Sequence, residues 1–234
     1  MGKRAYDGTM VSRKRSKRGQ SRFTRFGRSQ TTNVSRTWPH QRYYDPIYFD
    51  PFPYKMQCIM RYTDTVVLDP ITVAGTVSHH LFRANGIHKP DFTGIGHQPN
   101  GHDQYADIYT HYQVIESICT IQPVTVDDRI YGINLCSSAT EPDWSGNLES
   151  KGARFTHSYT DGAGPIVTNS YKERTFGNKF QVSALFGASP VDPFFFDVFM
   201  QGRSSSSTTT EGFTAHVTIT YKVKMWEPKL LGVS

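Results

Sequence analysis

Apolar and polar residues alternate one by one along much of the chain beyond residue 54. The clearest stretch is 213–226, where every second residue is apolar or aromatic and most of the residues between them are Thr, Lys and His. A side-chain period of two is typical of a β-strand with one buried face. Residues 55–68 repeat this pattern. The expected buried sets are Phe213, Ala215, Val217, Ile219, Tyr221, Val223 and Met225 in the first stretch, and Met56, Cys58, Met60, Tyr62, Val66 and Leu68 in the second.

Six further segments are rich in β-branched and aromatic residues and are separated by clusters of Asp, Gly and Pro. They are 71–83, 110–122, 129–137, 152–158, 165–176 and 193–201. No segment has a convincing helical period. Eight strands without helices predict two packed antiparallel sheets or a barrel, and the jelly roll is the commonest eight-stranded solution. We therefore predict an all-β fold, an eight-stranded antiparallel jelly roll that occupies residues 55–234.

The first 42 residues show neither the strand pattern nor enough apolar residues for a core. They contain twelve basic residues and one acid, so this arm carries 12 − 1 = +11, whereas residues 43–234 carry 14 − 19 = −5. Like charges at this density repel in any compact state, so we expect the arm to be disordered on its own. The basic residues of the arm are Lys3, Arg4, Arg13, Lys14, Arg15, Lys17, Arg18, Arg22, Arg25, Arg28, Arg36 and Arg42.

The composition of the arm predicts a nucleic-acid-binding tail. Nine of its twelve basic residues are Arg, whose planar guanidinium pairs with phosphate through two hydrogen bonds. Phe23, Phe26 and Trp38 lie between the arginines and are able to stack on unpaired bases. Two alternatives remain: a solvated tail that serves only solubility, and a membrane-surface arm, which is disfavoured because no amphipathic helical stripe accompanies the charge.

One cluster in the arm also has the composition of a nuclear localisation signal. It consists of Arg13, Lys14, Arg15, Lys17 and Arg18, interrupted only by a serine. This hypothesis implies nuclear import factors as partners, and the same residues would also serve nucleic-acid binding.

Residues 43–54 form a connector of unusual composition. Six of the twelve are aromatic and three are Pro, which favours an extended, stiff backbone. Packing along the surface of the β domain and stacking against bases are both compatible with this sequence.

Metal and cofactor sites are not predicted. Six of the nine histidines lie between residues 79 and 111, but His79 and His80 are adjacent in a predicted strand and should point to opposite faces. Neither an H-E-x-x-H nor an H-x-H spacing occurs. Asp103 and Asp107 leave open a hard cation at a subunit contact. No apolar run approaches the roughly 20 residues that span a bilayer, so membrane insertion is not expected.

Catalytic motifs are also lacking, so we do not predict an enzyme. Cys58, Cys119 and Cys136 are dispersed on predicted strands without C-x-x-C spacing, and we interpret them as buried free thiols. The Gly94–Gly96 pair does not continue as a dinucleotide-binding loop, and no G-x-S-x-G occurs.

The segment 81–104 provides a resemblance to a known family. It is similar to the F-x-A-N-x-I-x-x-P-D-x-T-G-x-G-H-Q-P-x-G-x-D-Q segment of capsid proteins from Rep-encoding circular single-stranded DNA viruses, the circovirus-like group. This resemblance implies a single jelly-roll capsid protein whose arm lies on the genome inside the shell, with localisation in the virion, assembly in the host nucleus, and an unknown cell receptor. A similar small shell fold occurs in plant satellite RNA viruses, so the choice of DNA depends on this motif alone.

Long loops of capsid-like proteins are candidates for subunit contacts, and 84–109 is too polar and too rich in Gly and Pro for a strand. The residues that we assign to such contacts are Asn85, Pro90, Asp91, Gly94, Gly96, His97, Gln98, Pro99, Asp103 and Gln104.

Charge arithmetic supports the same interpretation. A minimal closed icosahedral shell has about 60 copies of one chain. Their arms would supply 60 × 11, or roughly 660, positive charges, enough to neutralise very roughly a thousand nucleotides through counterion release. The predicted function is a coat protein that packages a single-stranded circular DNA genome. Two alternatives remain: a cellular, ribosomal-type nucleic-acid-binding protein with a basic extension, and a jelly-roll lectin or cupin-like enzyme with an incidental tail.

Overall fold

The computed structural model describes residues 51–124, 128–158, 164–176 and 180–230. By its internal contacts the chain divides into two units, Met1–Tyr48 and Phe49–Ser234, and all described residues belong to the second. The division falls inside the predicted connector. The predicted disorder of the arm lies outside the described residues and stays a prediction.

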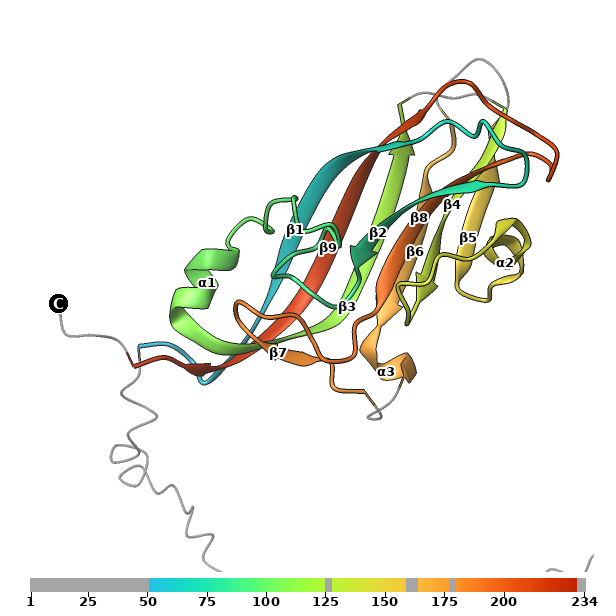
Figure 1. Cartoon of the computed structure of the whole chain (residues 1–234). Helices are drawn as coiled ribbons and strands as arrows, with labels where there is room; N and C mark the ends of the chain where they lie inside the picture. The colour runs from blue at the N-terminus through green and yellow to red at the C-terminus, as the bar shows by residue number, and fades with distance from the viewer. Residues whose placement is uncertain (1–50, 125–127, 159–163, 177–179, 231–234) are drawn as a thin grey trace, which may run out of the picture. The chain divides into compact units, whose positions relative to one another are not determined.

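Nine strands in the described residues form two antiparallel sheets (Figure 1). Sheet 1 has the order β1-β9-β3-β6, with β7 paired to a second part of β3, and sheet 2 has the order β2-β8-β4-β5. The strands are β1 (Lys55–Leu68), β2 (Val77–Arg83), β3 (Tyr109–Pro123), β4 (Arg129–Cys136), β5 (Ala153–His157), β6 (Val167–Lys172), β7 (Ser183–Leu185), β8 (Phe195–Gly202) and β9 (Phe213–Pro228).

The strand order is that of a jelly roll. Apart from β7, the chain behaves as one long hairpin that is rolled up: β4 pairs with β5, β3 with β6, β2 with β8, and β1 with β9. Two packed sheets result, and each contains strands from both halves of the chain. The predicted all-β sandwich is confirmed.

Most predicted strands recur with shifted ends, and 55–68 recurs as β1 without a shift. The strand predicted over 71–83 begins only at Val77, because a turn with Gly75 at φ 79° precedes it. The segment 165–176 divides into β6 and a four-residue helix, α3 (Glu173–Phe176). The three-residue strand β7 was not predicted, since so short a segment has no measurable period.

The absence of helices was also predicted, and this was wrong for three short segments. Besides α3, the connections contain α1 (His102–Ile108) and α2 (Trp144–Glu149). Asp143 caps α2 by accepting a hydrogen bond from the Gly146 N–H at 2.7 Å. Helices of four to seven residues are too short to show a 3.6-residue period. None of the helices in the described part of the chain is long and apolar enough to span a bilayer.

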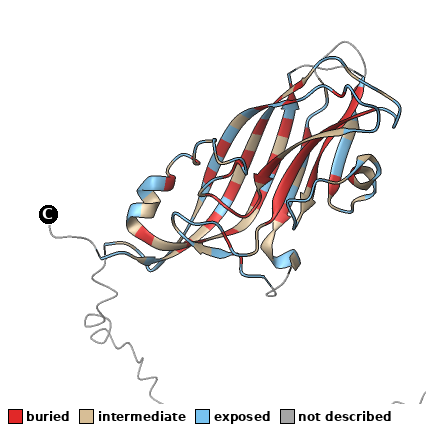
Figure 2. Ribbon diagram, in the orientation of Figure 1, coloured by how far each residue is buried: buried red, intermediate tan, exposed pale blue. Residues whose placement is uncertain are grey.

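The two sheets bury their facing surfaces in a single core. All seven residues predicted for the inward face of β9 are fully buried, and the alternation of buried and exposed positions along β1 and β9 is visible in Figure 2. The centre of sheet 2 is also covered on its outer side, because β8 is buried at every position, whereas β5 at the edge is largely exposed. The Trp144 indole of α2 donates to the Gly202 carbonyl at 3.1 Å, and the Gln201 amide donates to the Trp144 carbonyl at 3.2 Å. Sheet 1 therefore carries the open face.

We expect replacement of Ile219 by Ala to destabilise the fold by about 2–5 kcal/mol, because it leaves a cavity between the sheets. Thr218→Ala, on the opposite face of the same strand, is the matched control and should change the free energy of unfolding by less than about 0.5 kcal/mol. Chemical denaturation of the unassembled chain measures both values. Equal effects of the two substitutions would contradict the placement of the core.

Candidate nucleic-acid interface

The twelve basic residues of the arm lie outside the described residues, so their role stays a prediction. The end of the connector is described. The Tyr109 hydroxyl donates to the Pro53 carbonyl at 3.0 Å, and the Glu227 N–H donates to the Tyr54 carbonyl at 3.2 Å. Residues 53 and 54 thus lie against the β domain, whereas residues 43–50 are outside the described part.

The segment that carries the capsid-like motif begins with a buried amide. The side chain of Asn85 is fully buried, and its Nδ2 donates to the Asp192 carbonyl at 2.9 Å while its Oδ1 accepts from the Phe194 N–H at 2.9 Å. These two bonds join the start of the loop to the segment that enters β8. Asn85 therefore satisfies buried backbone groups within its own subunit.

Asp91 also has a structural role inside the subunit. Its Oδ1 accepts from both the N–H and the hydroxyl of Thr93 at 2.8 Å, which closes a tight turn. Its backbone pairs with Phe82, and the Arg83 guanidinium donates to the carbonyls of Lys89 and Asp91 at 2.6 and 3.2 Å. The aspartate and the arginine together hold the loop against the edge of β2.

Gly96 and His97 bring the same loop onto β1. A Cβ at Gly96 would lie 2.5 Å from the Tyr62 hydroxyl oxygen, so only glycine fits there. The His97 ring packs on Tyr62 with centroids 4.7 Å apart, and its two nitrogens lie 2.8 Å from the Gln98 carbonyl oxygen and 2.9 Å from that of Thr63. Most of the motif is thereby explained by the folding of the loop itself.

The remaining motif residues differ in exposure. Pro90 and Pro99 are buried, Gly94 has φ 79°, and the Gln98 amide lies 3.1 Å from His88 Nδ1. His97, Asp103 and Gln104 are exposed, the Asp103 side chain to 78%. Contact with a second copy stays a prediction for the whole loop, and among the ten residues assigned to it these three are the exposed ones.

The histidines at positions 79 and 80 have separate partners. His79 Nδ1 lies 2.9 Å from Asp197 Oδ1, whereas His80 packs on Phe82 with ring centroids 4.8 Å apart and lies 3.3 Å from Asp91 Oδ1. Burial raises the pKa of the Asp197 carboxyl, and the hydrogen bond from His79 opposes this effect. Within the described ranges, no group of three His, Cys, Asp or Glu side chains is placed to hold a metal ion.

All three cysteines are free thiols. Cys119 is buried as predicted, whereas Cys58 and Cys136 are only partly buried. Burial raises the pKa of each thiol, and that of Cys136 reaches about 11 with a further contribution from Asp197. At neutral pH they are protonated, which does not suit a nucleophile.

A basic surface appears on the open side of sheet 1 that the sequence analysis missed. The outward face of its strands carries five of the fourteen basic residues of the region 43–234 and two of its nineteen acids, Glu116 and, at the end of β9, Glu227, whose Oε2 lies 2.8 Å from His111 Nδ1. Glu116 lies 3.0 Å from Lys172 Nζ, so four cations are left without a partner acid on these strands. We call this surface the basic face; its cations are Lys55, Arg61, Lys172, Lys222 and Lys224.

The pattern that places these cations outward was already present in the alternation of 55–68 and 213–226. Strand order was the missing information, because residues 55 and 226 are opposite each other only when β1 pairs with β9. A body of net charge −5 thus carries a positive surface on one side.

No family model matches the chain, and no curated protein matches it. Among solved structures, Cocksfoot mottle virus is similar at 11% identity over 74% of this chain and 97% of that chain, with a TM-score of 0.48. The 60-mer BFDV capsid protein is similar at 9% identity over 78% and 100%, with a TM-score of 0.46. A semi-empty VLP of the Macrobrachium rosenbergii nodavirus is similar at 8% identity over 76% and 97%, also at 0.46. Since these TM-scores lie below 0.5, the fold is assigned from the strand topology above, and function is inferred from the residues of this chain.

The contact between His97 and β1 should depend on pH. Hydrogen bonds to the carbonyls of Gln98 and Thr63 raise the pKa of His97, since only an imidazolium donates from both nitrogens. Because the folded pKa is raised, this stabilisation is complete below about pH 6.5 and is lost as the pH rises through the pKa of the folded state. Hydrogen exchange of the amides of residues 91–101, corrected for intrinsic rates, should therefore be faster at pH 8 than at pH 6. In His97→Phe, which keeps a ring on Tyr62 without donors, this difference should vanish; its persistence would exclude His97 as the cause.

Proposed function

We propose that this chain is a coat protein that assembles into a small icosahedral shell and packages a single-stranded circular DNA genome. The separation of charge is the observation that carries the proposal: an arm of +11 precedes a body of −5, and five of the fourteen cations of that body lie together on the basic face. A globular protein that bound nucleic acid over its whole surface would not need a basic arm on an acidic body. This separation suits a shell subunit that has one side on nucleic acid and the other away from it.

The jelly-roll topology supports a shell subunit because rolling the hairpin leaves long connections at the ends of the sandwich, where neighbouring copies meet. The capsid-like motif lies in one such connection, between β2 and β3. Its inner residues hold the loop rigid, and a rigid loop suits a contact that is repeated in every subunit. His97, Asp103 and Gln104 are its exposed candidates for that contact.

The arm would supply most of the affinity for the genome. Its charge drives counterion release, which is independent of sequence and weakens steeply with salt. Single-stranded DNA as cargo is favoured by the motif of residues 81–104, and the cluster at residues 13–18 would serve nuclear import before assembly. The absence of any catalytic constellation in the sequence agrees with a structural protein.

Replacement of all twelve arm Lys and Arg by Gln should leave particles that contain little nucleic acid, as measured by the ratio of absorbance at 260 and 280 nm. The matched control converts the nine arginines to Lys and keeps the charge of +11; it should still package, although with altered salt dependence. Extracted cargo should be degraded by DNase and not by RNase. We call the chain with all twelve replacements the chain with the Gln arm. If its particles contained as much nucleic acid as wild-type particles, the proposed role of the arm would be wrong. A chain that binds nucleic acid only as a monomer would favour the ribosomal-type alternative.

The double substitution Asp103→Ala with Gln104→Ala should reduce assembly while the chain stays folded, because both side chains are exposed. A loss of about 1 kcal/mol at each contact, repeated around the shell, shifts assembly to higher protein concentration. Size-exclusion chromatography and electron microscopy measure the particle fraction, and circular dichroism checks the fold. Glu149→Ala, an exposed acid at the end of α2, is the control. Equal assembly of the double variant and the control would remove these two residues from the contact.

A further inference from the structure

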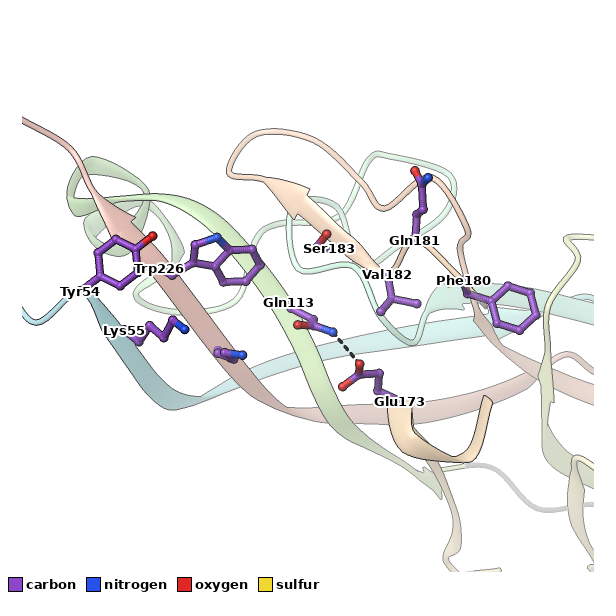
Figure 3. A pocket seen from close by; sticks show the side chains of 10 residues that line it. Tyr54, Lys55, Gln113, Glu173, Phe180, Gln181, Val182, Ser183 and Trp226 are labelled. Atoms are coloured by element: carbon purple, nitrogen blue, oxygen red, sulfur yellow. Dashed lines mark hydrogen bonds between the residues drawn. The ribbon is translucent and has the colours of Figure 1, made fainter. Parts of the chain in front are cut away.

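The basic face contains a pocket of about 500 Å³ where β1 begins. This volume lies in the usual range of small-molecule sites. Its walls come from β1, β3, β9, α3 and the segment that includes β7, and the side chains that matter here are Tyr54, Lys55, Gln113, Glu173, Lys224 and Trp226. Figure 3 shows Tyr54, Lys55 and Trp226 gathered on one side and Gln113 with Glu173 on the other.

Strand register places four of the side chains that line the pocket, Lys55, Trp226, Lys224 and Gln113, in two adjacent rows across sheet 1. One row places Lys55, Trp226 and His111 opposite one another on β1, β9 and β3. The next row places Gln57, Lys224 and Gln113 in the same order. The Trp226 indole and the His111 imidazole lie nearly parallel, 6° apart, with centroids at 5.5 Å. Trp226 is half-buried, so its indole is held by neighbours and still reaches the pocket.

Two ammonium groups lie beside aromatic rings in this pocket. Lys224 Nζ is 5.9 Å from the Trp226 centroid, and Lys55 Nζ is 5.8 Å from that of Tyr54. A base stacked on the indole has its own phosphate several ångströms away, within reach of such flexible ammonium groups. An aromatic platform flanked by cations is the arrangement with which proteins bind single-stranded nucleic acid.

The opposite side of the pocket is acidic, so the two ends of the pocket favour different parts of a nucleotide. The Gln113 Nε2 donates to Glu173 Oε1 at 2.7 Å, so the carboxylate is held in place. A phosphate is repelled from this end and attracted to the lysines. Carboxylate oxygens accept hydrogen bonds, so the edge of a base that carries an amino group fits next to Glu173.

From this geometry we propose that the pocket binds one unpaired nucleotide of the packaged strand. The base stacks on Trp226, the phosphate lies at Lys55 and Lys224, and the base edge faces Glu173. The inference rests on the proposed function and adds a defined site to it. Arm and pocket differ in what they require: the charge of the arm attracts any nucleic acid, whereas the pocket needs a base that is free to stack, so duplex DNA does not occupy it.

Ultraviolet cross-linking of packaged wild-type particles, followed by trypsin digestion and mass spectrometry, tests the proposal directly. Cleavage after Lys224 and Lys229 yields the peptide Met225–Lys229, which contains Trp226. We expect nucleotide adducts on this peptide as well as on arm peptides. In Trp226→Ala the adducts at 225–229 should disappear while those on the arm persist, and Phe155→Ala, an exposed aromatic on β5, should leave both unchanged. Adducts confined to the arm in wild-type particles would overturn the pocket and leave the packaging proposal intact.

A second measurement isolates the pocket without depending on the folding of the Trp226 variant. In the full-length chain with the Gln arm, Lys55→Ala with Lys224→Ala should weaken binding of a fluorescent ten-nucleotide single strand by about tenfold. Lys89→Ala with Lys151→Ala removes the same charge from exposed positions away from the pocket and should weaken it much less. A fully paired duplex of the same length should not distinguish the two variants. If both double variants lost the same affinity for the single strand, the basic face would act only through its general charge, and the proposed nucleotide pocket would be wrong.

Discussion

The pairing of the last strand with the first is the constraint on which the rest of this structure depends. β9 lies between β1 and β3, antiparallel to both, over nearly its whole length. Its inward side chains fill the centre of the core, and its outward side chains place Lys222, Lys224 and Trp226 on the open face of sheet 1. Because side chains alternate along a strand, one register determines both the core and the surface. A shift by one residue would bury the lysines and expose the core.

Several residues of the capsid-like motif stabilise the conformation of the loop that contains them. Asn85 pairs with backbone groups on both sides of Pro193, Asp91 closes a turn, and Gly96 permits the approach to Tyr62. A loop that leaves a sheet edge must satisfy its buried backbone groups, and short polar side chains do this without adding bulk. A motif of this kind therefore specifies a rigid loop conformation, while the surface presented to a partner is left to its few exposed residues.

Positive charge is concentrated in this chain in two ways, by sequence in the arm and by folding on the basic face. The positive charge of the arm is concentrated within 42 consecutive residues, whereas the basic face is assembled from residues far apart in sequence that meet only in sheet 1. Three acids of the body lie at or beside the basic face: Glu116 and Glu227 on the strands, and Glu173 at the edge of the pocket. In a shell, such a subunit would concentrate positive potential on the genome side and limit it on the other.

Local pattern alone was sufficient to predict β1 and the buried faces of β1 and β9, because alternation is a property of consecutive residues. It was also sufficient for the charge of the arm. It was insufficient for β7, for the helices α1, α2 and α3, and for the late start of β2, since segments of a few residues have no period and a turn at Gly75 interrupts the apolar run. The basic face and the pocket at Trp226 depended on tertiary structure. Lys55 and Trp226 are 171 positions apart, and only the rolled hairpin, stabilised by the burial of both sheets, brings them together.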